Sequence, residues 1–354
     1  MQNEVEILPI GGKILAMSQQ SPSPRPTPEL IFDTLNAHQR TAALKAAIEL
    51  DVFTAIGEGA DTAASLAKRC NATERGIRIL CDNLAIIGLL RKQGSQYALP
   101  PDSAMFLDRR SPACVASMVG FMALPQMVDP FRSLADTIRK GYSPDDAQRG
   151  APDDPVWVEF ARSMMPMQSP VAEAVAGMIG TENAGKKVLD IAAGHGMFGI
   201  ALAKRNPNVD VYASDWPNVL ELAKENAKMA GVAARFHALP GDAFEVDLGS
   251  NYDLIIVANF LQLFDRQSNE RLLRKLHAAS APGGRVVMVG FIPNEDRLTP
   301  PRAASFSLIM LGTTPGGDAY TFSEYERMFQ NAGFSRSELR PLPMGPMSVI
   351  ISYK

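Results

Sequence analysis

One stretch, Lys187 to Asp215, limits the possible folds of this chain more than any other. It begins with a short apolar run, Val188 to Ile191, which is typical of a buried strand. A glycine turn with the spacing G-x-G-x-x-G follows, then a helix-like run rich in Ala, Leu and Ile, and then a second strand ending at Asp215. These parts form the first half of a nucleotide-binding βαβ unit. The glycines are Gly194, Gly196 and Gly199.

Asp215 suits a ribose-binding role. It lies 215 − 194 = 21 residues after Gly194, close to the roughly 20 expected for an acid that accepts hydrogen bonds from ribose hydroxyls. The glycines lack a Cβ, so the loop backbone can turn sharply and approach a ligand closely. The sequence therefore predicts a nucleoside-containing cofactor on this loop.

Asp190 discriminates between two cofactors that such a loop can hold. A dinucleotide places its pyrophosphate at the helix N-terminus, and a carboxylate four residues before Gly194 would repel it. The same carboxylate attracts the ammonium group of S-adenosyl-L-methionine (SAM), which carries no phosphate. The pattern D-x-A-x-G-x-G therefore favours SAM. The alternative is a Rossmann-like sheet with a vestigial site.

Composition narrows the class of protein. The 354 residues are enough for two domains, and 46% hydrophobic and 21% charged residues are ordinary for a globular protein. A net charge of −3 disfavours a broad nucleic-acid-binding face. No apolar run is long enough for a membrane helix, no signal peptide or metal site is expected, and three cysteines fit a reducing, cytoplasmic location.

The first part of the chain predicts a small helical module. Residues 1–26 have the composition of a flexible tail, in which Met17 is an alternative start. Apolar spacing predicts helices over 28–50, 61–67 and 73–87, followed by a hairpin around Gly94. This order is that of a winged helix. Its modest basic character favours dimerisation over DNA binding, although a DNA-binding regulator that senses SAM stays an alternative.

A methionine-rich region follows and suggests a wall that adapts to a ligand. Residues 104–180 combine eight methionines with interleaved aromatic side chains, and methionine packs well around irregular shapes. Ordinary helical core is the competing interpretation for any single residue. Residues 141–155 are dense in Asp, Pro and Gly and predict an exposed loop. The candidate substrate-binding residues are Phe121, Met122, Trp157, Phe160, Met164 and, further along the chain, Phe306 and Met310.

The second half of the chain alternates between strands and helices, which predicts a doubly wound parallel sheet of the α/β class. Helices are expected between the strands, for example over 219–230 and 269–279. Two strands at the end of the chain, 334–340 and 347–353, predict a terminal hairpin that inserts one antiparallel strand. The parallel strands are expected at 187–192, 210–215, 234–239, 252–259 and 285–291.

Three segments carry a resemblance to a known family. VLDIAAGHG at 188–196, YASD at 212–215 and PGDAF at 240–244 resemble the class I SAM-dependent methyltransferases. With the helical module ahead of it, the chain is similar to the plant-type small-molecule O-methyltransferases and their bacterial relatives, over about residues 30–354. This family includes acetylserotonin and caffeate methyltransferases, and its winged-helix domain builds a homodimer. Phe160 and Met164 resemble its F-x-x-x-M motif, which lies over methyl donor and acceptor.

The resemblance and the strand ends together imply a set of cofactor-binding residues. Glycines of the loop approach the methionine part, an acid takes the ribose, and a G-D-x-F motif surrounds the adenine. Asn259 stands at the switch point where open α/β sheets bind ligands. The implied residues are Asp190, Gly194, Gly196, Asp215, Trp216, Asp242, Ala243, Phe244 and Asn259.

The catalytic base of the family is missing at its expected place. Most members have a histidine in an L-H-D-W or L-H-H-F motif after the fourth strand, where it deprotonates the hydroxyl that receives the methyl group. Gln262 occupies this position, in the run NFLQLFD from Asn259 to Asp265, and an amide is not a useful base. The family's later acid, in G-G-x-E-R-T, is also absent from Gly316 to Thr321.

Other residues remain candidates for catalysis. His195 and Asp265 are the first two, and for His195 contact with the substrate and a solvated place in the loop stay equally open. His237, Tyr320 and Asp318 are further substitutes for the base. Methyl transfer can also rely on proximity and orientation alone, because an activated donor held in line with its acceptor needs little more.

The sequence therefore predicts a homodimeric, cytoplasmic SAM-dependent methyltransferase of secondary metabolism. Its acceptor is expected to be a small aromatic or polyketide-like molecule, most simply methylated on oxygen, with neither nucleic acid nor membrane as a partner. A SAM-binding enzyme that no longer transfers methyl, such as a pericyclase or decarboxylase, is the alternative. The expected domains are a tail at 1–26, the dimerisation domain at 27–110, a helical linker at 111–180 and the SAM domain at 181–354.

Overall fold

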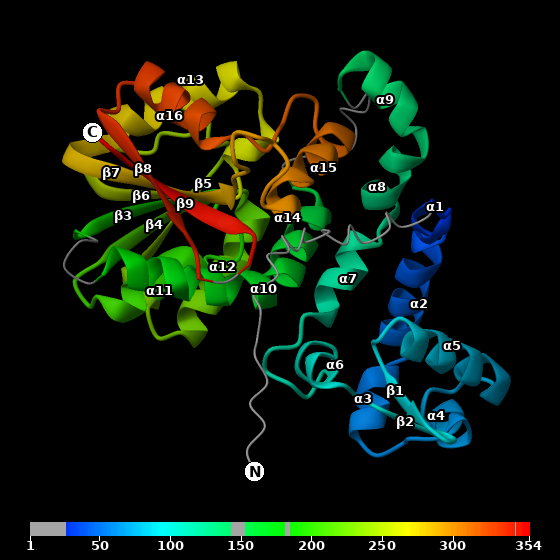
Figure 1. Ribbon diagram of the computed structural model, residues 1–354. Coiled ribbons are helices and arrows are strands. Elements are labelled where there is room, and N and C mark those ends of the chain that lie inside the picture. The colour runs from blue at the N-terminus through cyan, green and yellow to red at the C-terminus, as the bar shows by residue number, and fades with distance from the viewer. Residues whose placement is uncertain (1–25, 143–152, 181–184, 344) are drawn as a thin grey trace, which may run out of the picture. The chain divides into compact units, whose positions relative to one another are not determined.

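The computed structural model describes residues 26–142, 153–180, 185–343 and 345–354 (Figure 1). Nearly all of the predicted tail and residues 143–152 of the predicted loop lie outside these ranges. The chain divides into two units, Met1–Ala42 and Ala43–Lys354. None of the described helices is both long and apolar enough to cross a bilayer.

The first predicted helix is two helices. α1 spans Glu29–Leu35 and α2 spans Ala37–Glu49, with Asn36 between them. Pro28 is the N-cap of α1 rather than its first residue. No residue of α1 is buried, although four of its seven side chains are large and apolar. This helix therefore presents an apolar surface.

The winged-helix pattern is present in the structure. Its elements are α3 (Val52–Gly57), α4 (Ala63–Arg69), α5 (Glu74–Ile86), β1 (Arg91–Gln93) and β2 (Gln96–Ala98). The hydroxyl of Thr62 caps α4 by accepting from the Ser65 N–H, and β1 pairs with β2 in the predicted antiparallel hairpin. α3 was not predicted, because five of its six residues are buried and it has no polar face to give a helical period.

A set of helices connects this module to the sheet. Short ones come first: α6 (Pro101–Phe106), α7 (Ala116–Met122), α8 (Pro125–Val128), the 3-10 turn η1 (Asp129–Ser133) and α9 (Leu134–Lys140). The long α10 (Pro155–Ile179) follows, capped by the Asp154 carboxylate, which accepts from the Val156 N–H at 2.9 Å. α7 packs against α10.

The sheet has seven strands in the order β5-β4-β3-β6-β7-β9-β8. The first five run parallel, and β9 pairs antiparallel with both β7 and β8, so the predicted insertion of one antiparallel strand is confirmed. β5 begins two residues later than predicted, because Ala233–Arg235 form a 3-10 turn, and β7 begins five residues earlier. The strands are β3 (Lys187–Ile191), β4 (Asp210–Asp215), β5 (Phe236–Pro240), β6 (Tyr252–Ala258), β7 (Ser280–Phe291), β8 (Arg336–Pro341) and β9 (Met347–Tyr353).

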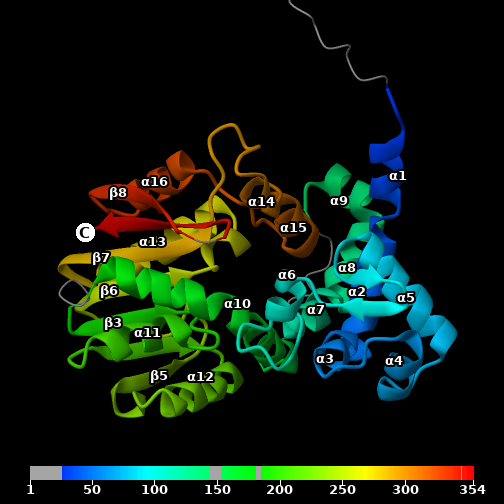
Figure 2. The ribbon, with the colours of Figure 1, turned by 60° about the horizontal axis from the view of Figure 1, so that its bottom comes forward.

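Helices cover both faces of the sheet (Figures 1 and 2). α10, α11 (Met197–Arg205) and α12 (Pro217–Met229) pack on one face, and α13 (Arg266–Ala279) and α16 (Phe322–Asn331) pack on the other. Successive strand residues point to opposite faces, so Val188 joins the first core and Leu189 the second. The doubly wound architecture is thus confirmed. Two shorter helices, α14 (Pro301–Ala304) and α15 (Phe306–Thr313), follow β7.

The third glycine of the loop motif serves packing. Gly199 lies in the first turn of α11, and a Cβ built on it would stand 2.5 Å from Cγ1 of Val211 on β4. The branch of a valine on a central strand has little room to move. The absent side chain therefore lets the start of α11 approach the sheet.

We expect Gly199→Ala to destabilise the protein. Overpacking costs about 1–3 kcal/mol, and the better helix propensity of alanine returns at most about 1 kcal/mol. Gly120→Ala is the matched control, since Gly120 also lies in a helix and a Cβ there meets only open space. Urea denaturation should show a loss of stability for the first variant and none for the second; a Gly199→Ala variant as stable as Gly120→Ala would contradict this packing role.

Candidate active site

The predicted cofactor-binding residues gather at the carboxyl edge of the parallel sheet. Their loops leave β3, β4, β5 and β6 at the same edge, because neighbouring parallel strands end together. The turn after β3 is tight: Ala192, Gly194 and Gly196 have positive φ angles of 50°, 57° and 75°. Glycine adopts these angles without strain, which explains two of the three motif glycines.

Asp190 is the most deeply buried acid of this edge. Its side chain is 1% exposed, and Oδ2 accepts from the Gly199 N–H at 3.0 Å, at the start of α11. Burial raises the pKa of Asp190 to about 7, against the opposing effect of this hydrogen bond. Since a carboxylate in such a place lacks a countercharge, a nearby positive charge would stabilise its ionised form.

Asp215 holds the loop and keeps capacity for a ligand. Its Oδ2 accepts from the Gly194 N–H at 2.8 Å and its Oδ1 from the Trp216 N–H at 2.7 Å. Burial raises the pKa of Asp215, although these two bonds act in the other direction. A carboxylate has about four lone-pair sites. Two are left, which matches the two hydroxyls of a ribose.

His195 is buried, so the interpretation that it is a solvated loop residue is wrong. Its Nδ1 accepts from the Met197 N–H at 3.1 Å, which leaves the proton on Nε2, and Nε2 donates to Oε1 of Gln168 on α10 at 3.2 Å. Burial lowers the pKa of His195 to about 4. The neutral ring has both nitrogens engaged within the protein, so it offers no free base.

Two buried polar groups at the same edge lack partners. Both amide atoms of Asn259 and the hydroxyl of Ser214 have no hydrogen bond within the protein. Buried polar groups are normally bonded, so these are places that a polar ligand can satisfy. Asn259 also has a positive φ of 52°, directly after β6. The donor and acceptor set at this edge therefore fits SAM.

The predicted adenine residues lie on the next loop. Asp242 is exposed, and its Oδ1 accepts from the Phe244 N–H at 2.8 Å. The ring of Phe244 lies 4.9 Å from that of Phe264, and Phe260 is 4.9 Å from Phe264 in turn. The buried Ala243 belongs to the core against which Phe244 and Phe260 pack. An aromatic cluster thus lines the loop after β5.

Gln262 lies in the 3-10 turn η4 (Leu261–Leu263), just after β6, and is 3% exposed. Its Oε1 faces the backbone of β7, where it accepts from the Phe291 N–H at 3.4 Å. A Cβ on Gly290 would stand 3.0 Å from the same oxygen. The amide therefore occupies space that only a glycine leaves open.

The other candidate catalytic residues have structural partners. The Asp265 carboxylate caps α13 by accepting from the Ser268 N–H at 2.7 Å. The Tyr320 hydroxyl donates to the Phe264 carbonyl at 2.9 Å, and burial raises its pKa to about 12. Asp318 pairs with Arg297 at 3.3 Å. None of these three is positioned as an unengaged base.

The two remaining histidines of the sheet region lie elsewhere. The ring of His237, on β5, contacts Oδ1 of Asp210 at 3.0 Å and packs 4.8 Å from Tyr212, at the third residue of β4. His277 stands on α13 and packs edge-on against Phe334. Neither belongs to the loops at the carboxyl edge.

The predicted substrate residues form separate groups. Phe121 on α7 and Phe160 on α10 pack with ring centroids 5.1 Å apart, and Met164 is buried one turn later. Phe306, on α15, stacks on Phe291 with centroids 4.0 Å apart and planes at 7°.

Three of the predicted substrate-binding residues differ from what is expected of a pocket wall. Met122 is 47% exposed and thus open to solvent, whereas Met310 is 4% exposed and thus packed within the protein. Trp157 packs with Trp216, which was assigned to the cofactor, around Ala161 between α10 and α12. The two tryptophans thus belong to one cluster.

Sequence reasoning missed the residues that fix the loop from behind. Gln168 binds His195, and the Asn226 amide on α12 donates to the His195 carbonyl at 2.8 Å. Phe291 positions the amide of Gln262. These partners are 27 to 31 residues apart in the chain, and each alone is an ordinary helix or strand residue. The one signal in the sequence is that Gln168 and Asn226 are polar residues at helix positions that face the core.

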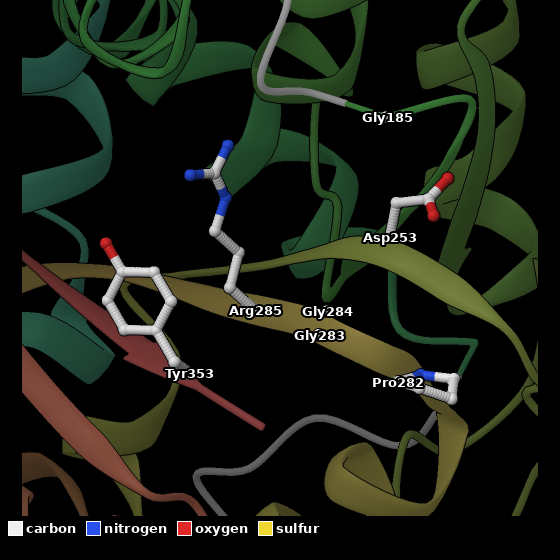
Figure 3. Close-up of a pocket in the computed structure, with 7 residues that line it drawn as sticks. All are labelled: Gly185, Asp253, Pro282, Gly283, Gly284, Arg285 and Tyr353. Carbon is white, nitrogen blue, oxygen red and sulfur yellow. The ribbon is translucent and has the colours of Figure 1, made fainter.

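A polar hollow of about 290 Å³ lies at the opposite edge of the sheet (Figure 3). Its lining comes from the amino ends of β6 and β7 and from the last residue of β9. The Asp253 carboxylate there accepts from the N–H groups of Lys186 and Lys187 at 2.8 and 3.0 Å. This hollow is thus separated from the candidate site by the length of the strands.

Comparison with known proteins matches both halves of the chain. The model of the O-methyltransferase domain matches residues 146–335, and that of the O-methyltransferase dimerisation domain matches residues 32–109. A solved structure from Nostoc punctiforme, assigned as an O-methyltransferase, is 51% identical, with a TM-score of 0.89 over 93% of this chain and 99% of that one.

Curated proteins with similar sequences are also O-methyltransferases. The tetracenomycin polyketide synthesis 8-O-methyl transferase of Streptomyces glaucescens is 27% identical over 86% of this chain and 91% of its own length. Mouse acetylserotonin O-methyltransferase is 28% identical over 91% of this chain and 87% of its own length. Two solved structures of this fold hold SAM or S-adenosylhomocysteine. The chain therefore belongs to the O-methyltransferase family and is a SAM-dependent methyltransferase.

Proposed function

We propose that the protein transfers the methyl group of SAM to an oxygen of a small aromatic or polyketide-like acceptor. The observation that carries this proposal is the set of acids, glycines and unpartnered polar groups at one edge of the sheet. The names of relatives that act on a polyketide and on acetylserotonin support the acceptor class. No feature of the structure favours the non-methylating alternative.

Each cofactor residue has a role that its geometry supports. Asp215 uses its two remaining lone-pair sites for ribose hydroxyls, and the Asn259 amide supplies a donor and an acceptor without partners in the protein. Gly194 and Gly196 keep the loop close to the ligand. Asp190 lies behind the loop and provides negative potential for the cationic end of the cofactor. Trp216 and the loop from Asp242 to Phe244 border the adenine.

The acceptor lies next to the aromatic side chains that follow the sheet edge. Phe160 and Met164 on α10 and Phe306 on α15 offer apolar faces, and Phe160 is 37% exposed. SAM supplies an electrophilic methyl group on a positively charged sulfur. The residues of this chain bind the acceptor in line with that group and exclude water, which can supply much of the rate acceleration. Gln262 takes no proton.

The assembly proposal rests on the N-terminal module. We infer a homodimer formed through residues 27–110, since α1 exposes Leu30, Ile31 and Phe32 and the matched domain is a dimerisation domain. Residues 111–180 form the helical wall of the substrate site, and residues 181–354 form the SAM domain. The cytoplasm is the proposed location, because three cysteines without a disulfide fit a reducing compartment.

The buried acid predicts a pH-dependent affinity for SAM. In the protein without ligand the pKa of Asp190 is raised to about 7, and the positive charge of the bound cofactor lowers it. Binding of SAM at a pH below 7 must therefore release a proton from Asp190. SAM affinity should rise by up to about tenfold per pH unit toward pH 7 and level off above it. Calorimetry across pH 5–8 measures this. Asp190→Asn, which retains an acceptor for the Gly199 N–H, should flatten the profile.

The same variant gives a test without ligand. Since the folded pKa of Asp190 is raised from 3.8 to about 7, the wild type loses stability as pH rises between those values. Asp190→Asn lacks this loss, so the difference between its melting temperature and that of the wild type should grow in favour of the variant from pH 5 to pH 8. A difference in melting temperature between variant and wild type that is the same at both pH values would contradict a buried Asp190 without a countercharge.

The proposed reaction is tested by product release. Purified protein with SAM and a panel of hydroxylated aromatic acceptors should release S-adenosylhomocysteine and form a methyl ether, as detected by mass spectrometry. Asp215→Ala should reduce SAM binding by about 2–4 kcal/mol, since hydrogen bonds to a charged group contribute about 1.5–3 kcal/mol each. Wild-type protein that binds SAM and converts an acceptor without releasing S-adenosylhomocysteine would support the non-methylating alternative.

Light scattering tests the homodimer. An obligate interface of this kind is expected to bury more than about 2,000 Å², and the purified protein should have the mass of a dimer at micromolar concentration. Phe32→Asp should shift the mass toward the monomer, because a charge would enter an apolar interface. Gln267→Asp, at an exposed position of α13 outside residues 27–110, is the control and should leave the dimer intact. A wild-type monomer would overturn the assembly proposal.

A further inference from the structure

The amide of Gln262 has a fixed direction. A backbone N–H can only donate, so the atom that faces the Phe291 N–H at 3.4 Å must be the amide oxygen. The missing side chain of Gly290 makes room for that oxygen. What remains for a ligand is the NH₂ group, which donates and cannot accept.

Backbone contacts hold this turn in place. The Gln262 carbonyl accepts from the Asp318 N–H at 3.0 Å, and a Cβ on Gly317 would stand 2.4 Å from the same carbonyl. The loop after α15 thus packs directly on the backbone of η4. These contacts fix the backbone of η4, and turning the side-chain oxygen of Gln262 outward would lose its bond to the Phe291 N–H of β7.

The titratable groups on the elements around Gln262 are all engaged. On its own turn and α13, Asp265 caps the helix. On the packed loop, Asp318 pairs with Arg297, which also binds Glu324 of α16 at 2.5 Å, and Tyr320 donates to a carbonyl. Arg266 pairs with Glu324 as well. Among the described residues, this neighbourhood offers a donor and cations but no unengaged proton acceptor.

We propose that Gln262 donates a hydrogen bond to an acceptor oxygen that is already ionised when it binds, so that the substrates are acidic phenols and enols conjugated with a carbonyl group. This inference rests on the proposed function and specifies its acceptor class. A neutral phenol must lose a proton during transfer, and none of the described residues around Gln262 is free to take it. An ionised oxygen is stabilised by the amide donor instead.

The reaction then balances without a base. A lone pair of the acceptor oxygen forms the new bond to the methyl carbon, and the pair of the broken carbon–sulfur bond stays on sulfur. The negative charge of the acceptor and the positive charge of the sulfonium disappear together. The proton has already gone to water before binding, so no protein group has to accept one.

Two probes separate ionised from neutral acceptors. 2-Hydroxy-1,4-naphthoquinone has a hydroxyl conjugated with a carbonyl and ionises well below pH 7, whereas 2-naphthol ionises near the phenol pKa of about 10. Absorbance titration in the presence of S-adenosylhomocysteine reports the pKa of the bound hydroxyl without turnover and without the sulfonium charge. We expect the wild-type protein to lower the pKa of the bound hydroxynaphthoquinone and to bind it more tightly than naphthol at pH 7.

Variants of equal size isolate the donor. Gln262→Glu retains an acceptor for the Phe291 N–H but replaces the donor by a negative charge, so it should raise the bound pKa and reduce methylation of the hydroxynaphthoquinone about ten- to hundredfold. Gln262→Met should lose most of the pKa lowering. Gln267→Glu adds the same charge at an exposed position of α13 and is the control. Binding of S-adenosylhomocysteine verifies that each variant is folded.

Three results would overturn the inference. The first is a wild-type protein that does not bind the hydroxynaphthoquinone or leaves the pKa of its hydroxyl unchanged, and the second is a Gln262→Met variant that still lowers this pKa. The third is methylation of naphthol with a pH–rate profile that reports ionisation of an enzyme group near pH 6.5. In the last case methyl transfer stands and only the acceptor class fails. Absence of S-adenosylhomocysteine release with every acceptor would instead reject the proposed function, while the bound pKa still tests the donor.

Discussion

Burial of a single carboxyl group in the middle of the sheet organises this enzyme. Asp190 lies on β3 with its neighbours β4 and β6 on either side, and its carboxylate accepts a hydrogen bond from the first turn of α11. That bond requires α11 to begin close to the strand, which only Gly199 permits. Taking a carboxylate out of water without a countercharge is costly. A ligand with a positive charge offsets this cost, so the buried Asp190 favours a cationic cofactor. The same residue requires the close approach of α11 to the sheet, so it affects both the fold and the choice of cofactor.

The glycine loop is held from behind by helices on which the acceptor also depends. His195 joins the loop to Gln168 of α10, and Asn226 of α12 binds the loop backbone. Two turns before Gln168, α10 carries Phe160 next to Phe121. One long helix therefore contacts the cofactor loop near its middle and the proposed acceptor wall near its start. Because burial lowers the pKa of His195 to about 4, its ring stays neutral near pH 7 and holds the loop without a change of charge.

Strands were predicted well from sequence, and contacts across the fold were not. β4 and β9 begin and end where apolar alternation and turn residues predicted them. The buried helix α3 was missed because a helix without a polar face has no readable period. The solvated interpretation of His195 was wrong because its partners lie on other helices, and the orientation of Gln262 depends on a strand 29 residues away. Local patterns give elements and their loops, whereas side-chain partners depend on packing.

The place of β9 in the sheet has a consequence for synthesis. β8 pairs only with β9, and β9 lies between β7 and β8 although it is the last of the seven strands to be made. While the ribosome is still producing residues 347–353, β7 has an open edge and β8 has no partner strand. Unpaired edges favour association between chains. The nascent protein therefore passes through a stage with a completed cofactor loop and an unfinished sheet, and the pairing of β9 with β7 and β8 closes that edge.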